Sequence, residues 1–380
     1  MKREILQPTY YEKFSCIGAA CEDTCCAGWK VAVDKKSFHK YRKVTSGALA
    51  QTLQTNITRE RVDPSDETYA KMKLDDDGNC AFLNENKLCN IYIELGEDYL
   101  CHTCTTYPRH VRRVDNRIEK SLTPSCPEAA RLLLLNTKGI DFTLHQEAVD
   151  ETYVGYVEMS TLFEEIRMFA IQILQSRHTS IENRLVVLGM FLEKLNATTQ
   201  KEWEKKIPLY TKIYTRILQD AERRNLFREL PDTAGMIEIA HALIQNQETV
   251  SVRFRECLME LQEGLQLVNE EEIEHSIHLY EEIQQKYYDP FFEQHSYILE
   301  NYLVNCVFKD SLMSNFYFEY EAMRIRFLYM KVILMGMVSH HQTLSKEMVI
   351  KLIQATSKTF DTNKAYRDGL KEILKEDQVF

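Results

Sequence analysis

The most constraining feature of the sequence is the concentration of cysteine at one end. Nine of the 11 cysteines lie between residues 16 and 126, and only Cys257 and Cys306 lie beyond them. An odd count of nine fits a set of disulfides poorly, and a secreted disulfide-rich protein is normally short. Because clustered thiols that stay reduced most often bind a metal, we expect metal or iron–sulfur binding in this segment, with disulfides as the alternative.

The spacing of these thiols allows one metal site with spare ligands, or two sites. A zinc ion or an iron–sulfur cluster takes about four thiolates. The two-residue gap between Cys101 and Cys104 lets both sulfurs face one metal, whereas the adjacent pair Cys25 and Cys26 seldom donates both. Spacing alone does not choose zinc over iron–sulfur. The candidate metal ligands are Cys16, Cys21, Cys25, Cys26, Cys80, Cys89, Cys101, Cys104 and Cys126.

Charge and turn residues divide the chain near the end of the cysteine segment. Residues 1–130 hold five of the eight prolines and carry 19 basic and 19 acidic side chains. Residues 131–380 carry 28 basic and 38 acidic side chains, which gives the whole net charge of −10. We expect a mainly α protein with two domains. A small irregular cysteine-rich domain, which binds a metal or cluster, spans 1–130, and an irregular, acidic, all-α helical bundle spans 131–380.

Apolar residues at steps of three and four predict the helices of the second domain. About eight helices are expected, with breaks at Pro208, Pro231 and Pro290. The apolar stretch from 327 to 338 is about 12 residues long and contains Lys331, whereas a membrane span needs about 20. One of these patterns, an apolar stripe along a single helix face, consists of Tyr320, Met323, Phe327, Met330, Leu334, Met335 and Val338.

Several classes of function lack their sequence signatures. No two glycines stand at GxG spacing and there is no GxxxxGK[ST] loop, so the usual dinucleotide, S-adenosylmethionine and phosphate loops are missing. The radical S-adenosylmethionine pattern CxxxCxxC fits Cys21 and Cys25, but Gly28 stands at its third position. No domain has the basic excess typical of nucleic-acid binding. We expect a cytoplasmic protein that binds neither membrane nor nucleic acid, and its oligomeric state is open.

Four segments make the sequence recognisable. They are CIGAACEDTCCAGWKV at 16–31, CAFL at 80–83, LCNIY at 88–92 and CHTCTTYPR at 101–109. With them the chain resembles the flagellin lysine-N-methylase (FliB-like) family and the broader class of zinc- or iron-chelating cysteine-cluster domains. The resemblance covers residues 5–130 and continues more loosely toward the C-terminus. It implies methylation of the ε-amine of flagellin lysines, or those of another lysine-bearing protein, with S-adenosylmethionine and an iron–sulfur (4Fe-4S) cluster, or zinc as the alternative metal.

Two further residues are candidate cofactor-binding groups. Tyr107 and Arg109 follow Cys104 directly, where Arg109 can meet the carboxylate of S-adenosylmethionine. The alternative for Arg109 is an ion pair with a surface acid. The leading hypothesis is therefore a protein lysine N-methyltransferase. The alternative is a non-enzymatic zinc- or iron–sulfur-binding interaction module, and an iron–sulfur redox protein is a third possibility.

Overall fold

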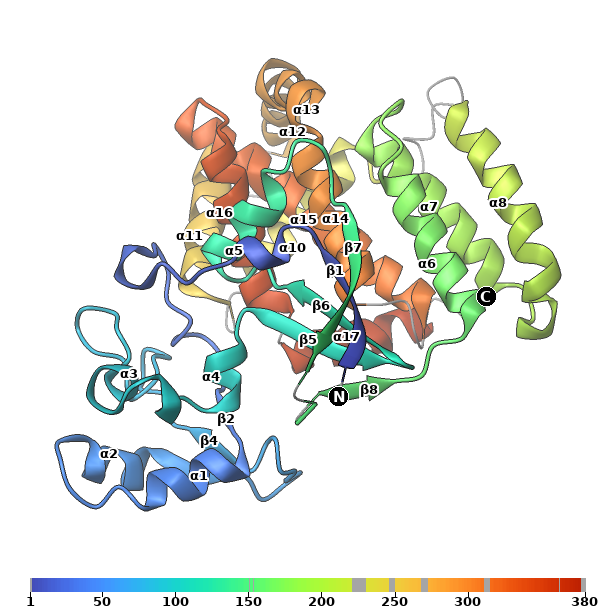
Figure 1. Ribbon diagram of the computed structural model, residues 1–380. Coiled ribbons are helices and arrows are strands. Elements are labelled where there is room, and N and C mark those ends of the chain that lie inside the picture. Colours follow the sequence, from blue (N-terminus) through green and yellow to red (C-terminus); the bar gives the residue numbers. More distant parts are fainter. Residues whose placement is uncertain are drawn as a thin grey trace.

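The computed structural model is mainly α-helical with two small sheets (Figure 1), and it describes residues 2–149, 151–152, 154–220, 230–245, 250–267, 273–310, 315–361 and 363–376. The α-helices of these residues are α1 (Lys35–Arg42), α2 (Leu49–Asn56), α3 (Asn90–Leu95), α4 (His102–Thr106), α5 (Pro127–Leu134), α6 (Thr161–Leu174), α7 (Ile181–Asn196), α8 (Trp203–Gln219), α10 (Thr233–Gln245), α11 (Val252–Gly264), α12 (Ile273–Ile283), α13 (Asp289–His295), α14 (Tyr297–Asp310), α15 (Phe316–His341), α16 (Lys346–Phe360) and α17 (Lys364–Glu376). The strands are β1 (Lys2–Pro8), β2 (Ala32–Val33), β3 (Ile57–Arg59), β4 (Ala70–Met72), β5 (Arg109–Val114), β6 (Arg117–Leu122), β7 (Phe142–Ala148) and β8 (Gly155–Val157). Shorter turns are the 3₁₀ helices η1 (Tyr11–Lys13), η2 (Gly18–Ala20), η3 (Glu97–Tyr99) and η4 (Gln200–Glu202), and the π-helix η7 (Gln284–Tyr288).

Residues 25–106 form a small unit, which we call the cysteine-rich module. Its elements are short: helices α1 to α4 and a three-stranded sheet in the order β2-β4-β3. The module has its own hydrophobic core, in which Tyr41 and Phe82 pack with the thiols of Cys80 and Cys101. Figure 1 shows it at one side of the molecule, apart from the long helices. A unit with so little regular core is of the kind that a metal commonly stabilises.

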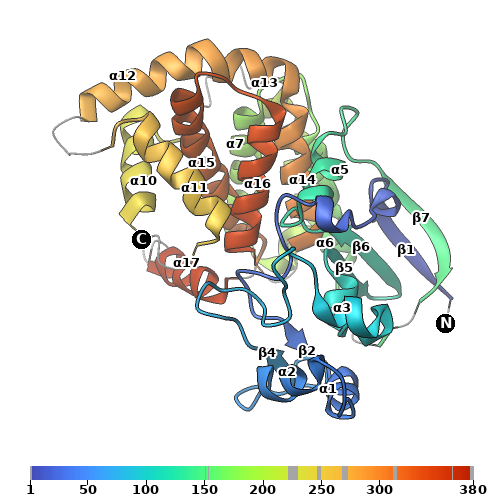
Figure 2. The same ribbon diagram turned by 90° about the vertical axis from the view of Figure 1, so that its left-hand side faces the viewer.

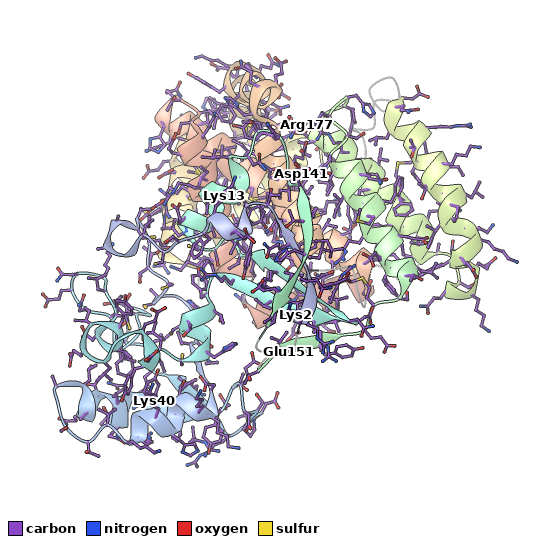
Figure 3. All side chains as sticks on the ribbon, viewed as in Figure 1. Lys2, Lys13, Lys40, Asp141, Glu151 and Arg177 are labelled. Atoms are coloured by element: carbon purple, nitrogen blue, oxygen red, sulfur yellow. The ribbon has the colours of Figure 1, made fainter. Side chains whose placement is uncertain are left out.

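A five-stranded sheet joins the module to the helices, and nothing in the sequence reading predicted it. Its order is β7-β1-β6-β5-β8, with β1 parallel to β6 and antiparallel to β7. Strands β7 and β8 lie beyond residue 130, so this part of the second domain is not helical as expected. The sheet thus contains strands from both sides of the expected boundary at residue 130, and that boundary stays a prediction. At the start of β1, Arg3 Nε donates to Glu151 at 2.7 Å; Figure 3 labels Glu151 and the neighbouring Lys2.

The helices from α6 onward form the main body of the protein. Its core helix, α15, is 26 residues long, and all seven residues of the apolar stripe expected there are buried. Helix α15 lies against α11 and α16 (Figure 2). The glycines at 264 and 336 permit this close approach, because a Cβ on Gly264 would lie 2.0 Å from the carbonyl oxygen of Gly336. Within the described residues, no helix combines the length and apolar character needed to cross a bilayer.

The structure differs from two expectations about the helices: their number and the break at Pro208. The described residues from 161 onward contain eleven α-helices, where about eight were expected. Pro208 lies inside α8 and does not break it. A proline removes one backbone hydrogen bond to the residue four positions earlier; here that residue is the exposed Glu204, whose carbonyl water can reach. Pro290 stands in the first turn of α13, directly after η7, while Pro231 precedes α10 as expected.

Candidate functional site

Six of the nine clustered cysteines lie close together in the cysteine-rich module, and we call them the six-thiol group: Cys25, Cys26, Cys80, Cys89, Cys101 and Cys104. The sulfurs of Cys25 and Cys26 are 4.0 Å apart. The charges of Cys89, Cys101 and Cys25 act on Cys80, and those of Cys101, Cys26 and Cys89 act on Cys104. Burial, reinforced by these neighbours, raises the pKa of Cys80 to about 11. The fold therefore gathers thiols that are up to 79 residues apart in the sequence.

Backbone N–H groups contact several of these sulfurs where a helix begins. Cys89 precedes α3, and its sulfur accepts hydrogen bonds from the N–H groups of Ile91 and Tyr92. Cys101 precedes α4 in the same way, with bonds from Thr103 and Cys104. Such bonds favour the thiolate over the thiol. Burial opposes them, and at Cys89 burial is the larger effect, so the pKa of Cys89 is raised.

Cys101 and Cys104 form a tightly linked pair, as the two-residue gap between them predicts. The side-chain hydrogen bond between the two thiols lowers the pKa of Cys101 and raises that of Cys104. Cys101 is fully buried, and its sulfur is also 3.5 Å from the carbonyl oxygen of Ala32. The two thiols of this pair are therefore close enough for the ionisation of one to affect the other.

The remaining cysteines of the segment form a second, smaller gathering, the three-thiol group: Cys16, Cys21 and Cys126. Cys126 precedes α5, and its sulfur accepts bonds from the N–H groups of Glu128 and Ala129. Burial raises the pKa of Cys126 to about 12, and the charges of Cys21 and Cys16 add to the effect. The structure thus divides the nine candidate ligands into six and three. Cys257 and Cys306, which the sequence analysis set apart, are buried within α11 and α14.

Helix α16 of the main body holds the segment that carries Cys25 and Cys26. Lys358 donates to both carboxylate oxygens of Asp23, at 2.9 and 2.8 Å, and to the carbonyl oxygen of Thr24 at 2.9 Å. The fully buried Gln354 donates to Asp23 at 2.8 Å and to the carbonyl oxygen of Ser125 at 2.7 Å. One face of α16 therefore positions residues next to both thiol groups. The sequence analysis missed Lys358 and Gln354, because no local pattern marks them.

Of the two expected cofactor-binding residues, Tyr107 lies between the thiol groups and Arg109 does not. The hydroxyl of Tyr107 is 3.1 Å from Ser125 Oγ, and its ring stacks on Trp29 at 5.6 Å. Burial raises the pKa of Tyr107, and charges at Cys126 and Cys25 raise it further. Arg109 is exposed at the start of β5, where its guanidinium covers the ring of Phe14 at 4.9 Å. In the described residues it forms no ion pair, so the alternative of a surface ion pair is not seen either.

The chemistry of the six-thiol group suits a metal, although its present arrangement does not form a complete metal site. Thiolates are the donors that zinc and iron–sulfur clusters prefer. Within the described part of the chain, no three His, Cys, Asp or Glu side chains are placed to hold a metal ion together. These side chains would have to change rotamer to bind one. The ligand set therefore stays a prediction.

A cavity of about 950 Å³ lies in the main body, away from the thiols. It opens between α7, α10, the run from α12 to α13, and α15. Arg177, which Figure 3 labels, forms part of its wall from the segment between α6 and α7. Pockets that bind small molecules typically measure about 300–1,000 Å³, so this one can hold a ligand of that size. No sequence motif pointed to it, because its walls come from segments that are up to about 150 residues apart.

Comparison with a family model identifies the C-terminal part of the chain. The model of the FliB lysine N-methylase C-terminal domain matches residues 167–380. This region contains the main-body cavity and also the helix α16 that holds Asp23. It does not contain the nine clustered cysteines.

Three curated proteins are also similar to this chain. Two proteins named lysine-N-methylase, from Salmonella choleraesuis (strain SC-B67) and Salmonella typhimurium (strain LT2), are each 25% identical over 247 residues, which cover 63% of this chain. The match spans 59% of the length of those relatives. The flagellar biosynthetic protein FliU of Salmonella muenchen is 34% identical over 131 residues, which are 34% of this chain and 76% of that protein. No solved structure matches the chain.

Proposed function

The chain belongs to the family of the FliB lysine N-methylase C-terminal domain, and from this premise we propose that it methylates the ε-amine of lysine side chains in a protein substrate. The proposed substrate is flagellin or another lysine-bearing protein, and the proposed methyl donor is S-adenosylmethionine. The match of residues 167–380 to the family model is the observation that supports the proposal best. The relatives named lysine-N-methylase agree with it.

The reaction sets physical requirements on the site. The amine nitrogen forms a bond to the methyl carbon while the bond from that carbon to the sulfonium breaks, so the amine must be neutral and its proton must pass to a base or to water. A lysine amine has a reference pKa of about 10.4 and is mostly protonated at neutral pH. Burial of the amine lowers its pKa, and a base within hydrogen-bonding distance can accept the proton. The main-body cavity, whose lining includes the carboxylates of Asp232, Asp289 and Glu293, is a candidate place for such a site.

We also propose that the clustered cysteines hold an iron–sulfur cluster on which the activity depends. The support is the chemistry of the donors and the gathering of the six-thiol group, together with the resemblance of the cysteine segment. In this proposal Lys358 and Gln354 link the cluster-bearing segment to the main body. Zinc remains the alternative metal.

The first experiment is metal and sulfide analysis of protein purified without oxygen, together with its absorption spectrum. We expect about four irons and four sulfides per chain and a brown protein. The same preparation is then incubated with S-adenosylmethionine and flagellin, and methyl-lysine is sought by mass spectrometry. Methyl-lysine formation that is lost when the metal is removed supports both parts of the proposal. No methyl-lysine on flagellin or any other lysine-bearing protein, with fully loaded enzyme, contradicts the proposed activity.

One observation favours the second candidate function, a non-enzymatic module with a structural zinc. The cysteine-rich module has a small core of its own, and its thiols form part of that core. Small units of this kind commonly depend on a metal for folding alone. A colourless protein with one or two zinc ions per chain, unchanged after anaerobic reconstitution, would favour this candidate.

A further inference from the structure

The walls of the main-body cavity combine carboxylates with aromatic rings. Glu182, Asp232, Asp289 and Glu293 supply the carboxylates. Tyr280 and Tyr288 line the same space. An ammonium group favours both kinds of neighbour, since carboxylates offer opposite charge and the faces of aromatic rings attract cations.

Each cation in the cavity wall already takes part in an ion pair. Arg177 and Arg184 both bind Glu300, at 2.7 and 2.9 Å, and Lys331 binds Glu182 at 3.3 Å. Asp232, Asp289 and Glu293 form no ion pair among the described residues. Although Arg177 and Arg184 share one carboxylate, the three cations stand against five carboxylates once Glu300 is counted, so the net charge of the wall is negative. A ligand that presents a carboxylate, as the amino-acid end of S-adenosylmethionine does, would meet a wall of net negative charge whose arginines are already held by Glu300.

A lysine of the chain itself already occupies part of this environment. The ammonium nitrogen of Lys331 lies 5.1 Å from the ring centroid of Tyr288 and 3.3 Å from Glu182 Oε1. The hydroxyl of Tyr288 is 3.5 Å from the same carboxylate oxygen. Lys331 is the basic residue that interrupts the apolar stretch of α15. Its position shows how this wall accommodates a lysine-type ammonium group.

Among the described residues, the hydroxyl of Tyr280 lacks a hydrogen-bond partner and the carboxylate of Asp289 lacks an ion pair. The side chain of Tyr280 is 2% exposed, and its hydroxyl has no hydrogen-bond partner among the described residues. Leaving a buried hydroxyl unpaired costs about 1–3 kcal/mol. Asp289 lies near enough to Tyr280 for its charge to act on the hydroxyl. Burial raises the pKa of Asp289, and the nearby charge of Lys331 and a hydrogen bond from the Gln284 side chain offset this only in part.

We propose that this cavity binds a lysine side chain of the protein substrate, with its ammonium group between the carboxylate of Asp289 and the hydroxyl of Tyr280. The inference rests on the proposed function and names the acceptor site for it. Lys331 holds Glu182 beside this position, and Tyr288 forms the adjacent aromatic wall. The remaining volume accommodates the residues that flank the lysine.

The test measures peptide binding to the full-length protein without a methyl donor. The probe is a short fluorescent peptide with several lysines in a glycine–serine background, and a matched peptide carries norleucine in place of each lysine. We expect the wild type to bind the lysine peptide and not the norleucine peptide. Asp289→Asn should weaken binding about tenfold or more, because it removes a charge-assisted hydrogen bond. Tyr280→Phe should weaken it several-fold, and Glu67→Gln, at an exposed carboxylate outside the cavity, should leave it unchanged.

Thermal unfolding separates a loss of peptide binding from misfolding of the variant. Tyr280→Phe deletes a hydroxyl that has no partner, so thermal unfolding should occur at the same temperature or a higher one. Equal binding of the lysine peptide by the wild type and Asp289→Asn would overturn the inference and leave the methylation proposal standing. Loss of S-adenosylmethionine binding in Asp289→Asn, with peptide binding retained, would assign the cavity to the donor and also overturn it. Lysine-specific binding without methylation of any protein would contradict the proposed function alone.

Discussion

The ammonium group of Lys358 lies 2.8 Å from Oδ2 of Asp23, although 335 positions separate the two residues in the chain. The side chains are only 8% and 12% exposed. Asp23 stands two residues before Cys25, whereas Lys358 lies on α16, inside the region that the family model matches. This contact therefore connects the cysteine segment to the part of the chain that defines the family.

Replacing Lys358 with methionine should destabilise the protein strongly. The change keeps much of the side-chain volume but leaves Asp23 as an unpaired charge in a largely buried place. Breaking a buried pair in this way costs about 3–5 kcal/mol. Urea unfolding followed by circular dichroism measures the loss.

The matched control is Lys35→Met, which breaks the exposed pair of Lys35 with Asp66. These side chains are 46% and 68% exposed, so the expected loss is below about 1 kcal/mol. Similar free energies of unfolding for the two variants would contradict the role given to Lys358.

The helices were predictable where a single local pattern determines them. The stripe that includes Phe327 and Leu334 repeats at steps of three and four, and α15 buries both residues as expected. The five-stranded sheet was not predictable in this way. Its strand β1 is paired with β6 and β7, which lie more than 100 residues later. Neither the register nor the partner of β1 has a signal within its own seven residues.

The candidate site shows the same division between local and distant information. Cysteine spacing predicted that thiols would gather, and the structure divides them into the six-thiol and three-thiol groups. Arg109 was chosen for its nearness to Cys104 in sequence, but strand β5 begins there and places its side chain over Phe14. The cavity residues Asp289 and Tyr280 resemble ordinary helix residues in the sequence. Only packing against α7 and α15 gives them a shared environment.

Acid should destabilise the protein partly through Glu119 on β6. This carboxylate is 2% exposed and accepts hydrogen bonds from Arg167, Arg112 and Arg117. Burial alone would raise its pKa, but Arg167 and Arg112 outweigh burial and lower the pKa of Glu119 from 4.5 to about 2. The stabilisation is therefore fully present above pH 4.5 and is lost as the pH falls through about 2. A shift of this size corresponds to about 3 kcal/mol.

The measurement is the free energy of unfolding as a function of pH for the wild type and Glu119→Gln. Between pH 4.5 and 2 the wild type should lose about 3 kcal/mol more than the variant. Glu4→Gln, at an exposed carboxylate of β1, is the control and should follow the wild type. Parallel curves for wild type and Glu119→Gln would show that the carboxylate is not held by these arginines.

Gly264→Ala should destabilise the main body. The added Cβ would lie 2.0 Å from the carbonyl oxygen of Gly336, and both contacting groups belong to helix backbones that cannot yield without moving α11 from α15. Overpacking of this kind costs about 1–3 kcal/mol. Gly369→Ala is the matched control, since nothing lies within 4 Å of a Cβ at that position in α17. Gly369→Ala should instead raise the free energy of unfolding by up to about 1 kcal/mol, because alanine has a higher helix propensity than glycine. The measurement is the thermal unfolding temperature of both variants. Equal changes in this temperature would contradict the close contact between α11 and α15.

Removal of one thiol from the six-thiol group should remove metal from the protein. Cys104→Ala is the informative change, because Cys104 interacts with Cys101, Cys26 and Cys89 and stands at the centre of the group. If the cluster binds here, iron and sulfide per chain should fall to less than about half of the wild-type values after anaerobic reconstitution, since a cluster takes about four thiolates.

Cys257→Ala supplies the control for this prediction, because it removes a buried thiol from α11, where burial raises the pKa of the thiol to about 12. A buried neutral thiol of this kind acts as a small apolar side chain, so its loss should leave the metal content unchanged. Circular dichroism of both variants separates loss of metal from loss of fold. Full iron and sulfide content in Cys104→Ala would exclude that residue as a required ligand. The three-thiol group, with Cys126→Ala as its corresponding variant, would then be the next candidate for the cluster.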